Sequence, residues 1–281
     1  NGKVVKYFDD KNKVSMRIKR VKHLNETCPE VVKINDNMYY YDYIDGKLLS
    51  NITDEKVLNN FLYWCKDNLF INKKPNSTFT GDCFEMYDVK TKQRIKKLIN
   101  TELDKVTRIN GIKVEPIKDM LDKIDWNSLK TNTIPTLFHG DLQPENIIYN
   151  ESDKKFTLID WRQSFGMNLE MGDVYYDLGK LYHAILINGQ TILKDMFGFK
   201  RVGYSVDLNF YAKSNLVEFM NIFKKFCNDN DYDWSRVELI GILHYFNICT
   251  LYDNFKQGQY GDFLFLYGKY LLAKYQRDNN G

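Results

Sequence analysis

Residues 137–161 constrain the fold more than any other part of the chain. They read LFHGDLQPENIIYN, then a polar turn, then an apolar run that ends in FTLIDW. Two short apolar runs on either side of a polar turn predict a β-hairpin, with strands over 147–149 and 156–159. The two outer ends of such a hairpin would place Asn146 beside Asp160.

The polar residues around this hairpin suit phosphoryl transfer. Asp141 precedes Asn146 by five positions, on a loop stiffened by Pro144, so two carboxylates and one amide oxygen would converge. Hard oxygen ligands of this kind suit Mg²⁺, which also takes phosphate oxygens and water. Phosphoryl transfer further needs a group that orients the attacking hydroxyl and accepts its proton. We therefore expect Asn146 and Asp160 to hold Mg²⁺ and Asp141 to act as the catalytic base.

Composition excludes several other classes of protein. With 281 residues, 43% hydrophobic and 27% charged, the chain is neither disordered nor fibrous. A net charge of +3 is too small to indicate nucleic-acid binding. No apolar run approaches the roughly 20 residues that cross a bilayer, so no membrane insertion is expected. The five cysteines are widely spaced without a CxxC pair, which favours a reducing, cytoplasmic location.

Apolar periodicity predicts an α+β chain with a small β-rich beginning and a larger helical body. A strand over 3–8, a basic helix over 14–24 and a hairpin of 31–34 with 38–44 come first. The helices that follow are predicted over 54–70, 87–99, 116–126, 173–187, 207–228, 234–252 and 261–276.

The pattern His139-x-Asp141-x₄-Asn146, followed by a hydrophobic strand that ends at Asp160, resembles the signature of the aminoglycoside phosphotransferase/choline kinase-like superfamily. Gly172-Asp173-x-x-Tyr-Asp177-Leu resembles the GDPxxDLA segment of the same enzymes, and the run 160–183 resembles a branch found among bacterial capsule and surface-polysaccharide genes. The resemblance implies a protein-kinase-like fold of two lobes. Residues 1–45 would form the remainder of the β-rich N-terminal lobe and the hinge. Residues 46–281 would form the helical C-terminal lobe, with the catalytic hairpin at 137–161.

This resemblance implies an ATP- and Mg²⁺-dependent phosphotransferase whose acceptor is the hydroxyl of a small molecule. The acceptor would be a sugar, an amino alcohol such as choline, or a surface-polysaccharide precursor. Lys6 lies on a strand similar to the family's VAIK strand and would contact the nucleotide phosphates. Backbone groups of the hinge residues Asp42, Tyr43 and Ile44 would bind the adenine.

Four further residues receive roles from their place in the same motifs. His139 and Asp177 would brace the catalytic loop, although His139 could also act as an acid or base. Trp161 and Arg162 directly follow the metal-binding Asp160 and would face the substrate. Arg162 either recognises an anionic acceptor or forms a structural ion pair.

Two departures from the family pattern keep a second function open. No Gly-rich phosphate loop precedes Lys6, so we expect that loop upstream of this chain. The helix over 14–24 offers Lys6 no acidic partner, and its basic residues, including Arg17 and Arg20, are expected to be solvated. A non-catalytic, kinase-fold nucleotide-binding or scaffold module is therefore the alternative.

The acceptor and the oligomeric state are left open by the sequence. An aminoglycoside phosphotransferase is a further alternative, and it would need a cleft rich in acidic residues. The C-terminal half has no dense acidic cluster, but Glu170, Asp173, Asp229, Asp231 and Asp233 are candidates for such a cleft. Aromatic residues make up 15% of the chain, and most of those in the late helices have core spacing. In choline kinases, rings of comparable late helices form a cation–π cage for a quaternary ammonium group, and the resemblance extends that alternative to some of these rings without matching any single position. The rings are Tyr245, Phe246, Tyr252, Phe255, Phe263, Phe265 and Tyr267.

Overall fold

A computed structural model describes residues 2–252 and 258–279; Phe255 lies outside them. The N-terminal region is a three-stranded antiparallel sheet in the order β1-β3-β2, covered by helix α1. Asp10 begins α1 because its side chain accepts the backbone N–H of Asn12 at 2.9 Å. The bounds are β1 Lys3–Tyr7, α1 Lys11–Val21, the 3₁₀ turn Asn25–Thr27, β2 Val32–Asn35 and β3 Met38–Asp42.

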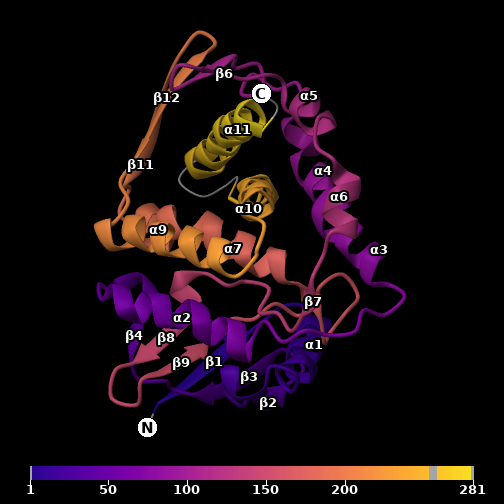
Figure 1. The fold of residues 1–281 in the computed structure, drawn as a ribbon, viewed down its shortest axis with the longest axis vertical. Coiled ribbons are helices and arrows are strands. Elements are labelled where there is room, and N and C mark those ends of the chain that lie inside the picture. Colours follow the sequence, from indigo (N-terminus) through magenta and orange to yellow (C-terminus); the bar gives the residue numbers. More distant parts are fainter. Residues whose placement is uncertain (1, 253–257, 280–281) are drawn as a thin grey trace.

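The predicted hairpin forms a second small sheet. Strands β8 (Ile147–Asn150) and β9 (Lys155–Leu158) pair antiparallel, and the short β4 (Lys47–Leu48) joins them along β8. Strands β7 (Pro135–Thr136) and β10 (Gly172–Asp173) form a further two-stranded pair just outside the hairpin. Figure 1 shows these strands at one end of the molecule, with the helices above them.

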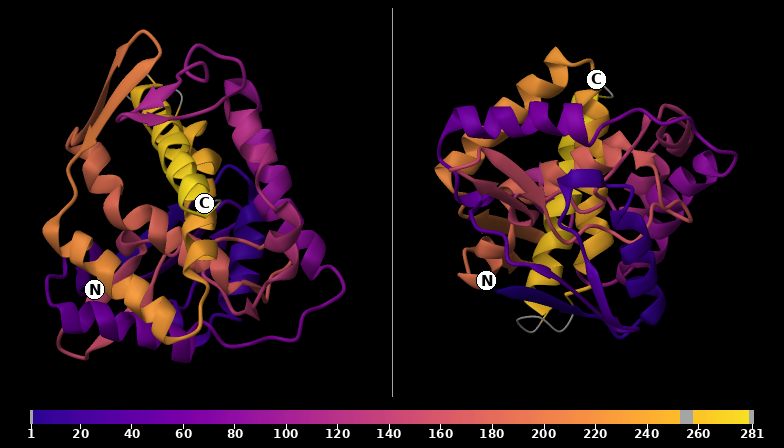
Figure 2. Two further views of the ribbon diagram at one scale, coloured as in Figure 1. Left: turned by 45° about the horizontal axis from the view of Figure 1, so that its top comes forward. Right: turned by 90° about the horizontal axis from the view of Figure 1, so that it is seen from below.

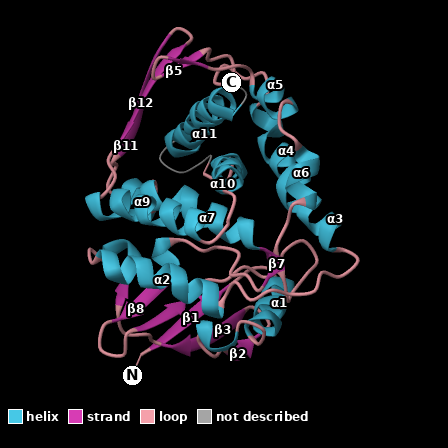
Figure 3. Cartoon of the chain, viewed as in Figure 1, coloured by secondary structure: helices cyan, strands magenta, loops and turns pink. Residues whose placement is uncertain are grey.

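The C-terminal region is mainly helical, and Figure 3 separates its helices from the strands. Helix α10 lies at its centre and packs most extensively against α7 and α11, while α2 packs against α9. The helices are α2 Glu55–Asn68, α3 Phe79–Phe84, a π-helix Glu85–Val89, α4 Lys90–Ile95, α5 Ile117–Asp122, α6 Trp126–Thr131, α7 Val174–Leu186, α8 Gly189–Leu193, α9 Ser214–Asp229, α10 Trp234–Cys249 and α11 Gln259–Asn279. Short 3₁₀ turns span Leu49–Asn51, Lys96–Leu98 and Pro144–Asn146.

A sheet that the sequence did not predict closes the far side of the helical region. Strands β5 (Arg108–Ile109), β6 (Ile112–Lys113), β11 (Phe197–Val202) and β12 (Ser205–Phe210) pair in the order β11-β12-β5-β6. The left view of Figure 2 shows how the long β11–β12 hairpin projects from the body. The fold is therefore a small strand-rich N-terminal region joined to a larger helical C-terminal region, as the apolar periodicity predicted.

Several predicted helix limits were wrong. The helix predicted over 207–228 begins only at Ser214, because Ser205–Phe210 alternates exposed residues with buried Val206 and Leu208, the period of a strand. The helix predicted over 116–126 is two helices, since Asp125 caps a new one by accepting Ser128 N–H at 3.0 Å. The helix predicted over 87–99 begins earlier, at Phe79.

One hydrophobic core runs through both regions, and the late aromatic residues belong to it. Phe246, Phe263 and Phe265 are fully buried, which confirms the core assignment for these rings. All five cysteines are buried. None of the helices within 2–252 and 258–279 has the length and apolarity to span a bilayer.

Candidate active site

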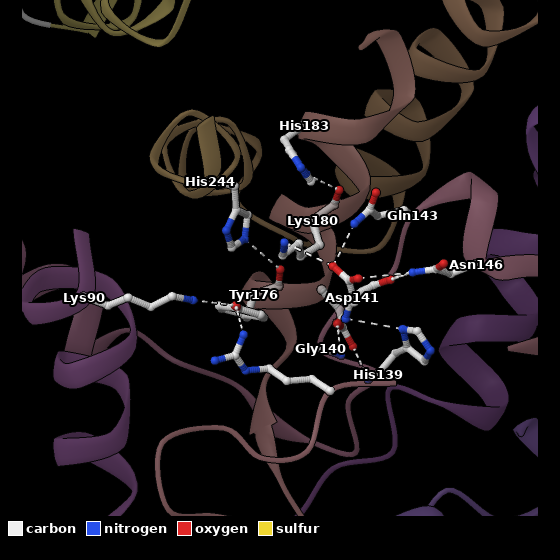
Figure 4. A network of polar contacts seen from close by, with 12 residues as sticks. Lys90, His139, Gly140, Asp141, Gln143, Asn146, Tyr176, Lys180, His183 and His244 are labelled. Atoms are coloured by element: carbon white, nitrogen blue, oxygen red, sulfur yellow. Dashed lines mark hydrogen bonds and ion pairs between the residues drawn. The ribbon is translucent and has the colours of Figure 1, made fainter. Parts of the chain in front are cut away.

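Asp141 lies at the centre of a polar network built on the loop from His139 to Asn146, which the sequence predicts to be the catalytic loop (Figure 4). Its carboxylate Oδ1 accepts the Gln143 amide at 2.8 Å and lies 3.1 Å from Lys180 Nζ on α7. The amide of Asn146 donates to the backbone oxygen of Asp141 at 2.8 Å and to its Oδ2 at 3.2 Å. The Asp141 side chain is 34% exposed, so the carboxylate remains accessible to a small molecule.

The charge state of Asp141 is fixed by these neighbours. Burial alone would raise its pKa, but the Lys180 ammonium and the Gln143 amide hold the pKa well below the usual range of a carboxyl group. Asp141 is therefore ionised at neutral pH and is a weak base. A carboxylate in this state can orient a hydroxyl group by accepting its hydrogen bond, and it can take the proton late in a loose phosphoryl transfer.

The backbone of the catalytic loop is held by Asp177 at the start of α7. Its two carboxylate oxygens accept the N–H groups of His139 at 2.5 Å and Gly140 at 2.6 Å. Burial raises the pKa of Asp177 to about 6. Gly140 has φ +84°, and an added Cβ there would lie 2.5 Å from the Cβ of Arg162. The turn before Asp141 therefore requires glycine.

His139 is completely buried under this turn. Its Nδ1 accepts the backbone N–H of Asp141 at 3.3 Å. Burial lowers the pKa of His139 to about 4, so the imidazole is neutral at neutral pH. These contacts are those of a residue that positions Asp141.

Asn146 and Asp160 lie at the outer ends of the hairpin, where the backbone N–H of Ile159 donates to Asn146 O at 2.9 Å. Asp160 has φ +60°, and its carboxylate pairs with Lys6 Nζ at 2.6 and 2.8 Å. The Asn146 amide donates through Nδ2 and leaves its Oδ1 as a possible ligand. Within 2–252 and 258–279, no three His, Cys, Asp or Glu side chains cluster as a metal site. One amide oxygen and one carboxylate fit Mg²⁺, which takes few protein ligands when phosphate supplies the others.

Arg20 of α1 is buried, which corrects the expectation of a fully solvated basic face. Its guanidinium donates to the backbone oxygens of Arg162 at 2.5 Å, His139 at 3.3 Å and Phe138. It also lies 3.7 Å from the centre of the Phe138 ring. Burial lowers the pKa of Arg20 to about 9, so the group stays charged at neutral pH. Helix α1 thus contacts the catalytic loop through a cation and carbonyl groups.

Trp161 and the three hinge residues are further members of the predicted site, and their surroundings differ from those of Asp141. Trp161 is fully buried; its indole N–H donates to Arg17 O at 3.1 Å, and its ring stacks on Tyr39, so it packs the two regions together. The hinge residues Asp42, Tyr43 and Ile44 line a surface cavity, and the Tyr43 N–H donates to Gly2 O at 2.9 Å.

Arg162 lies beside residues that the sequence analysis did not single out. Its Nη1 lies 3.5 Å from the Tyr176 hydroxyl, which also accepts from Lys90 Nζ at 3.2 Å. Lys180 was missed as well, although a helical turn separates it from Asp177 and both face the catalytic loop. The helical spacing between Asp177 and Lys180 could have identified Lys180 from the sequence. No sequence pattern could have identified Lys90, because it lies on a helix that is distant in sequence.

Comparison with protein families gives one match. Residues 96–199 match the model described as the phosphotransferase enzyme family. The matched segment is less than half of the chain, and over these residues the chain is similar to that family. It contains Asp141, Asn146, Asp160 and Asp177, so the resemblance drawn from the motifs is confirmed over these residues, while Lys6 and the hinge lie outside it.

Solved structures similar to this chain include a choline kinase, an ethanolamine kinase and an aminoglycoside phosphotransferase. A choline kinase from Cryptosporidium parvum is 11% identical, with 97% of this chain and 80% of the kinase covered and a TM-score of 0.49. An ethanolamine kinase from Plasmodium vivax is 14% identical, with 97% and 75% covered and a TM-score of 0.48. Aminoglycoside 2′-phosphotransferase-IIIa in complex with GDP is 11% identical, with 98% and 93% covered and a TM-score of 0.48. Similarity at this level defines neither acceptor nor mechanism. No curated protein matches the chain.

Proposed function

We propose that this chain is an ATP- and Mg²⁺-dependent kinase that phosphorylates a hydroxyl group of a small molecule. The observation that carries the proposal is the arrangement around Asp141: an accessible, ionised carboxylate in contact with Asn146, on a loop held by Asp177. The acceptor belongs to the class of sugars, amino alcohols or surface-polysaccharide precursors. The phosphotransferase match over residues 96–199 supports this function.

Each proposed role follows from a side chain's place in the network. Asp141 orients the acceptor hydroxyl and accepts its proton as the bond to phosphorus forms. Asn146 Oδ1 and Asp160 hold Mg²⁺, which neutralises charge on the nucleotide phosphates. Lys6 lies against Asp160 and would contact the nucleotide phosphates beside it. Catalysis then rests on positioning and charge neutralisation.

The proposed lobes meet at the hinge. Residues 1–45 form the N-terminal lobe and hinge, and residues 46–281 form the C-terminal lobe with the hairpin at 137–161. The nucleotide lies between them, with its adenine at the backbone of Asp42, Tyr43 and Ile44. The Tyr43 N–H is engaged by Gly2, so adenine binding there uses the neighbouring backbone groups or displaces Gly2.

A coupled ADP-release assay across neutral, cationic and anionic hydroxyl compounds tests the function. We expect at least one class to stimulate ADP release in the presence of Mg²⁺. Asp141→Asn should lower that rate by about 10²–10⁴-fold, the usual contribution of a positioned acid or base. The matched control is Asp119→Asn, an exposed acid of α5. Absence of stimulation by every class, with nucleotide bound, would refute the kinase.

The second candidate, a non-catalytic nucleotide-binding or scaffold module, is favoured by one observation. Both Asp160 oxygens are occupied by Lys6, which has no acidic partner on α1. Thermal shift with ATP separates the two functions. Stabilisation by ATP without Mg²⁺ dependence, together with no acceptor-dependent turnover, would establish the module.

A further inference from the structure

Three cationic side chains from separate parts of the chain gather beside Asp141. Lys90 begins α4, Arg162 follows the hairpin, and Lys180 lies one turn after Tyr176 on α7. Lys90 Nζ is 3.2 Å and Arg162 Nη1 is 3.5 Å from the Tyr176 hydroxyl. Figure 4 shows Lys90 reaching across from α4 to Tyr176, with Lys180 between Tyr176 and Asp141. We refer to Lys90, Arg162, Tyr176 and Lys180 as the basic cluster.

The basic cluster holds more positive than negative charge. Lys180 pairs with Asp141, but no carboxylate in the described part of the chain pairs with Lys90 or Arg162. Tyr176 is fully buried, and Lys90 and Arg162 are each half-buried. Two unpaired cations that converge on one buried hydroxyl repel each other and have lost part of their hydration. Such an arrangement is stabilised when an anion binds between them.

The titration behaviour of the cluster agrees with an excess of positive potential. Burial lowers the pKa of Lys90 to about 8, and the charges of Arg162 and Lys180 act in the same direction. Burial alone would raise the pKa of Tyr176, but Arg162, Lys90 and Lys180 together lower it to about 8. The point between them therefore favours negatively charged oxygen.

The backbone before Lys90 is also unusual. Residues Glu85–Val89 form a π-helix, and the N–H of Lys90 donates to Glu85 O, five residues back. π-Helices are rare and occur frequently at functional sites. The wider turn changes the rotation of the helix just before Lys90. This irregularity sits directly beside the lysine that reaches Tyr176.

We propose that the basic cluster binds an oxyanion group of the acceptor, so that the substrate is a hydroxyl compound carrying a phosphate or a carboxylate. The proposal rests on the kinase function above and names its acceptor class. Lys90 and Arg162 bind the anion while Asp141, beside Lys180, receives the hydroxyl. In the reaction the acceptor oxygen bonds to the γ-phosphorus, the bond to the bridging oxygen of ADP breaks, and the hydroxyl proton passes to Asp141.

The same charges disfavour cationic acceptors. An amino alcohol or an aminoglycoside placed against Asp141 would meet Lys180 at once and Lys90 and Arg162 nearby. Like charges at such a site cost binding free energy unless a carboxylate compensates. We therefore expect choline, ethanolamine and aminoglycosides to be poor substrates compared with sugar phosphates and sugar acids.

Binding is measured first, without turnover. Isothermal titration with inorganic phosphate, and separately with a sugar phosphate and a sugar acid, is done in the presence and absence of ADP and Mg²⁺. We expect binding by the parent chain, a loss of at least tenfold in Lys90→Met and in Arg162→Met, and partial retention in Lys90→Arg. Lys96→Met, an exposed lysine just after α4, is the matched control and should bind like the parent. The two sugar compounds show whether phosphate or carboxylate is the preferred anion.

A spectroscopic readout reports the cluster itself. A bound oxyanion raises the pKa of Tyr176 because it offsets the neighbouring cations. At pH 8 the tyrosinate absorbance that differs between the parent and Tyr176→Phe should fall when phosphate is added. A signal unaffected by phosphate would contradict binding at this site.

The outcomes separate this proposal from the function on which it rests. ADP release stimulated by neutral or cationic hydroxyl compounds but not anionic ones would overturn the anionic acceptor and leave the kinase standing. Phosphate binding that requires Lys90, with no acceptor-dependent ADP release, would support the anion site and refute the kinase. Equal anion binding by Lys90→Met, Arg162→Met and the parent would overturn the proposal.

Discussion

Lys6 of β1 and Asp160, 154 residues later, form an ion pair with Nζ 2.6 Å from Oδ1 and 2.8 Å from Oδ2. The pair joins the N-terminal sheet to the end of the catalytic hairpin. It also places an ammonium group and a carboxylate where phosphates and a metal ion are expected to compete for them.

Asp160→Asn should abolish the Mg²⁺-dependent part of ATP binding, because the amide loses the charge that holds the metal. Both side chains are partly exposed, so the pair itself contributes only about 0–1 kcal/mol and the fold should survive. Thermal shift with ATP, with and without Mg²⁺, checks this. The exposed Asp119→Asn should retain the full Mg²⁺-dependent shift; its retention in Asp160→Asn would contradict the proposed ligand.

Arg20→Met should destabilise the protein by on the order of 3 kcal/mol, because it removes three charge-assisted hydrogen bonds and leaves buried carbonyl groups without donors. Urea unfolding measures the change. Lys19→Met, one position earlier on the exposed side of α1, is the control and should change stability by less than about 0.5 kcal/mol. Equal losses of unfolding free energy in Arg20→Met and Lys19→Met would show that the Arg20 hydrogen bonds do not stabilise the fold.

Lys180→Met should shift the acidic limb of the pH–rate profile to higher pH. The ammonium of Lys180 holds the pKa of Asp141 low, and Asp141 must be ionised to accept the hydroxyl proton. Removing the cation raises that pKa, so activity is lost at a higher pH on acidification. The measurement is kcat/KM against pH, and Lys180→Arg should keep the limb near its original position. An unmoved limb in Lys180→Met would mean that Asp141 does not control the rate.

His139 should make the fold sensitive to acid. Its pKa is about 4 in the folded chain against about 6.5 when unfolded, so the unfolded state binds more protons between these values. The free energy of unfolding should therefore fall as the pH drops from about 6.5 to about 4, by on the order of 3 kcal/mol from this group. Urea unfolding at several pH values should show a shallower fall for His139→Asn. His23→Asn, at a half-exposed histidine, is the matched control substitution.

Gly179→Ala should destabilise the protein by about 1–3 kcal/mol through overpacking. An added Cβ would lie 2.5 Å from Ile240 Cγ2 and 3.1 Å from Gly241 N, where α7 and α10 meet closely. Gly189→Ala, at the start of α8, meets nothing within 4 Å and should be neutral or slightly stabilising. Thermal melts compare the two. Because Gly179 lies between Asp177 and Lys180, a misplaced α7 should also lower activity.

The parts of this protein that could be predicted were those encoded locally. The loop from His139 to Asn146 and the hairpin after it contain turn residues, apolar strands and the candidate site residues within one short segment. Asp177 could be assigned because the motif resembles a known family. In each case, the interacting groups are close in sequence or belong to one recognisable pattern.

The residues that were missed depend on tertiary packing. Helical periodicity cannot distinguish a solvated arginine from Arg20, whose partners are backbone oxygens more than a hundred residues away. Lys90 reaches Tyr176 across 86 positions. The hairpin β5–β6 did have a local signal, Asn110-Gly111, with both residues at positive φ as a two-residue hairpin turn requires. The prediction of a helix over 207–228 was wrong at its start, because a short strand with alternating exposed and buried residues is followed closely by a helix.

The contacts of Arg20 on α1 also bear on how the proposed kinase would be regulated. In protein kinases a glutamate on the corresponding helix pairs with the strand lysine, and moving that helix switches activity. Here, any outward movement of α1 would strip the donor from the carbonyl groups of Phe138, His139 and Arg162 at the same time. We therefore expect the position of the loop from His139 to Asn146 to depend on α1, so that a substitution that loosens the packing of α1 should also displace the loop.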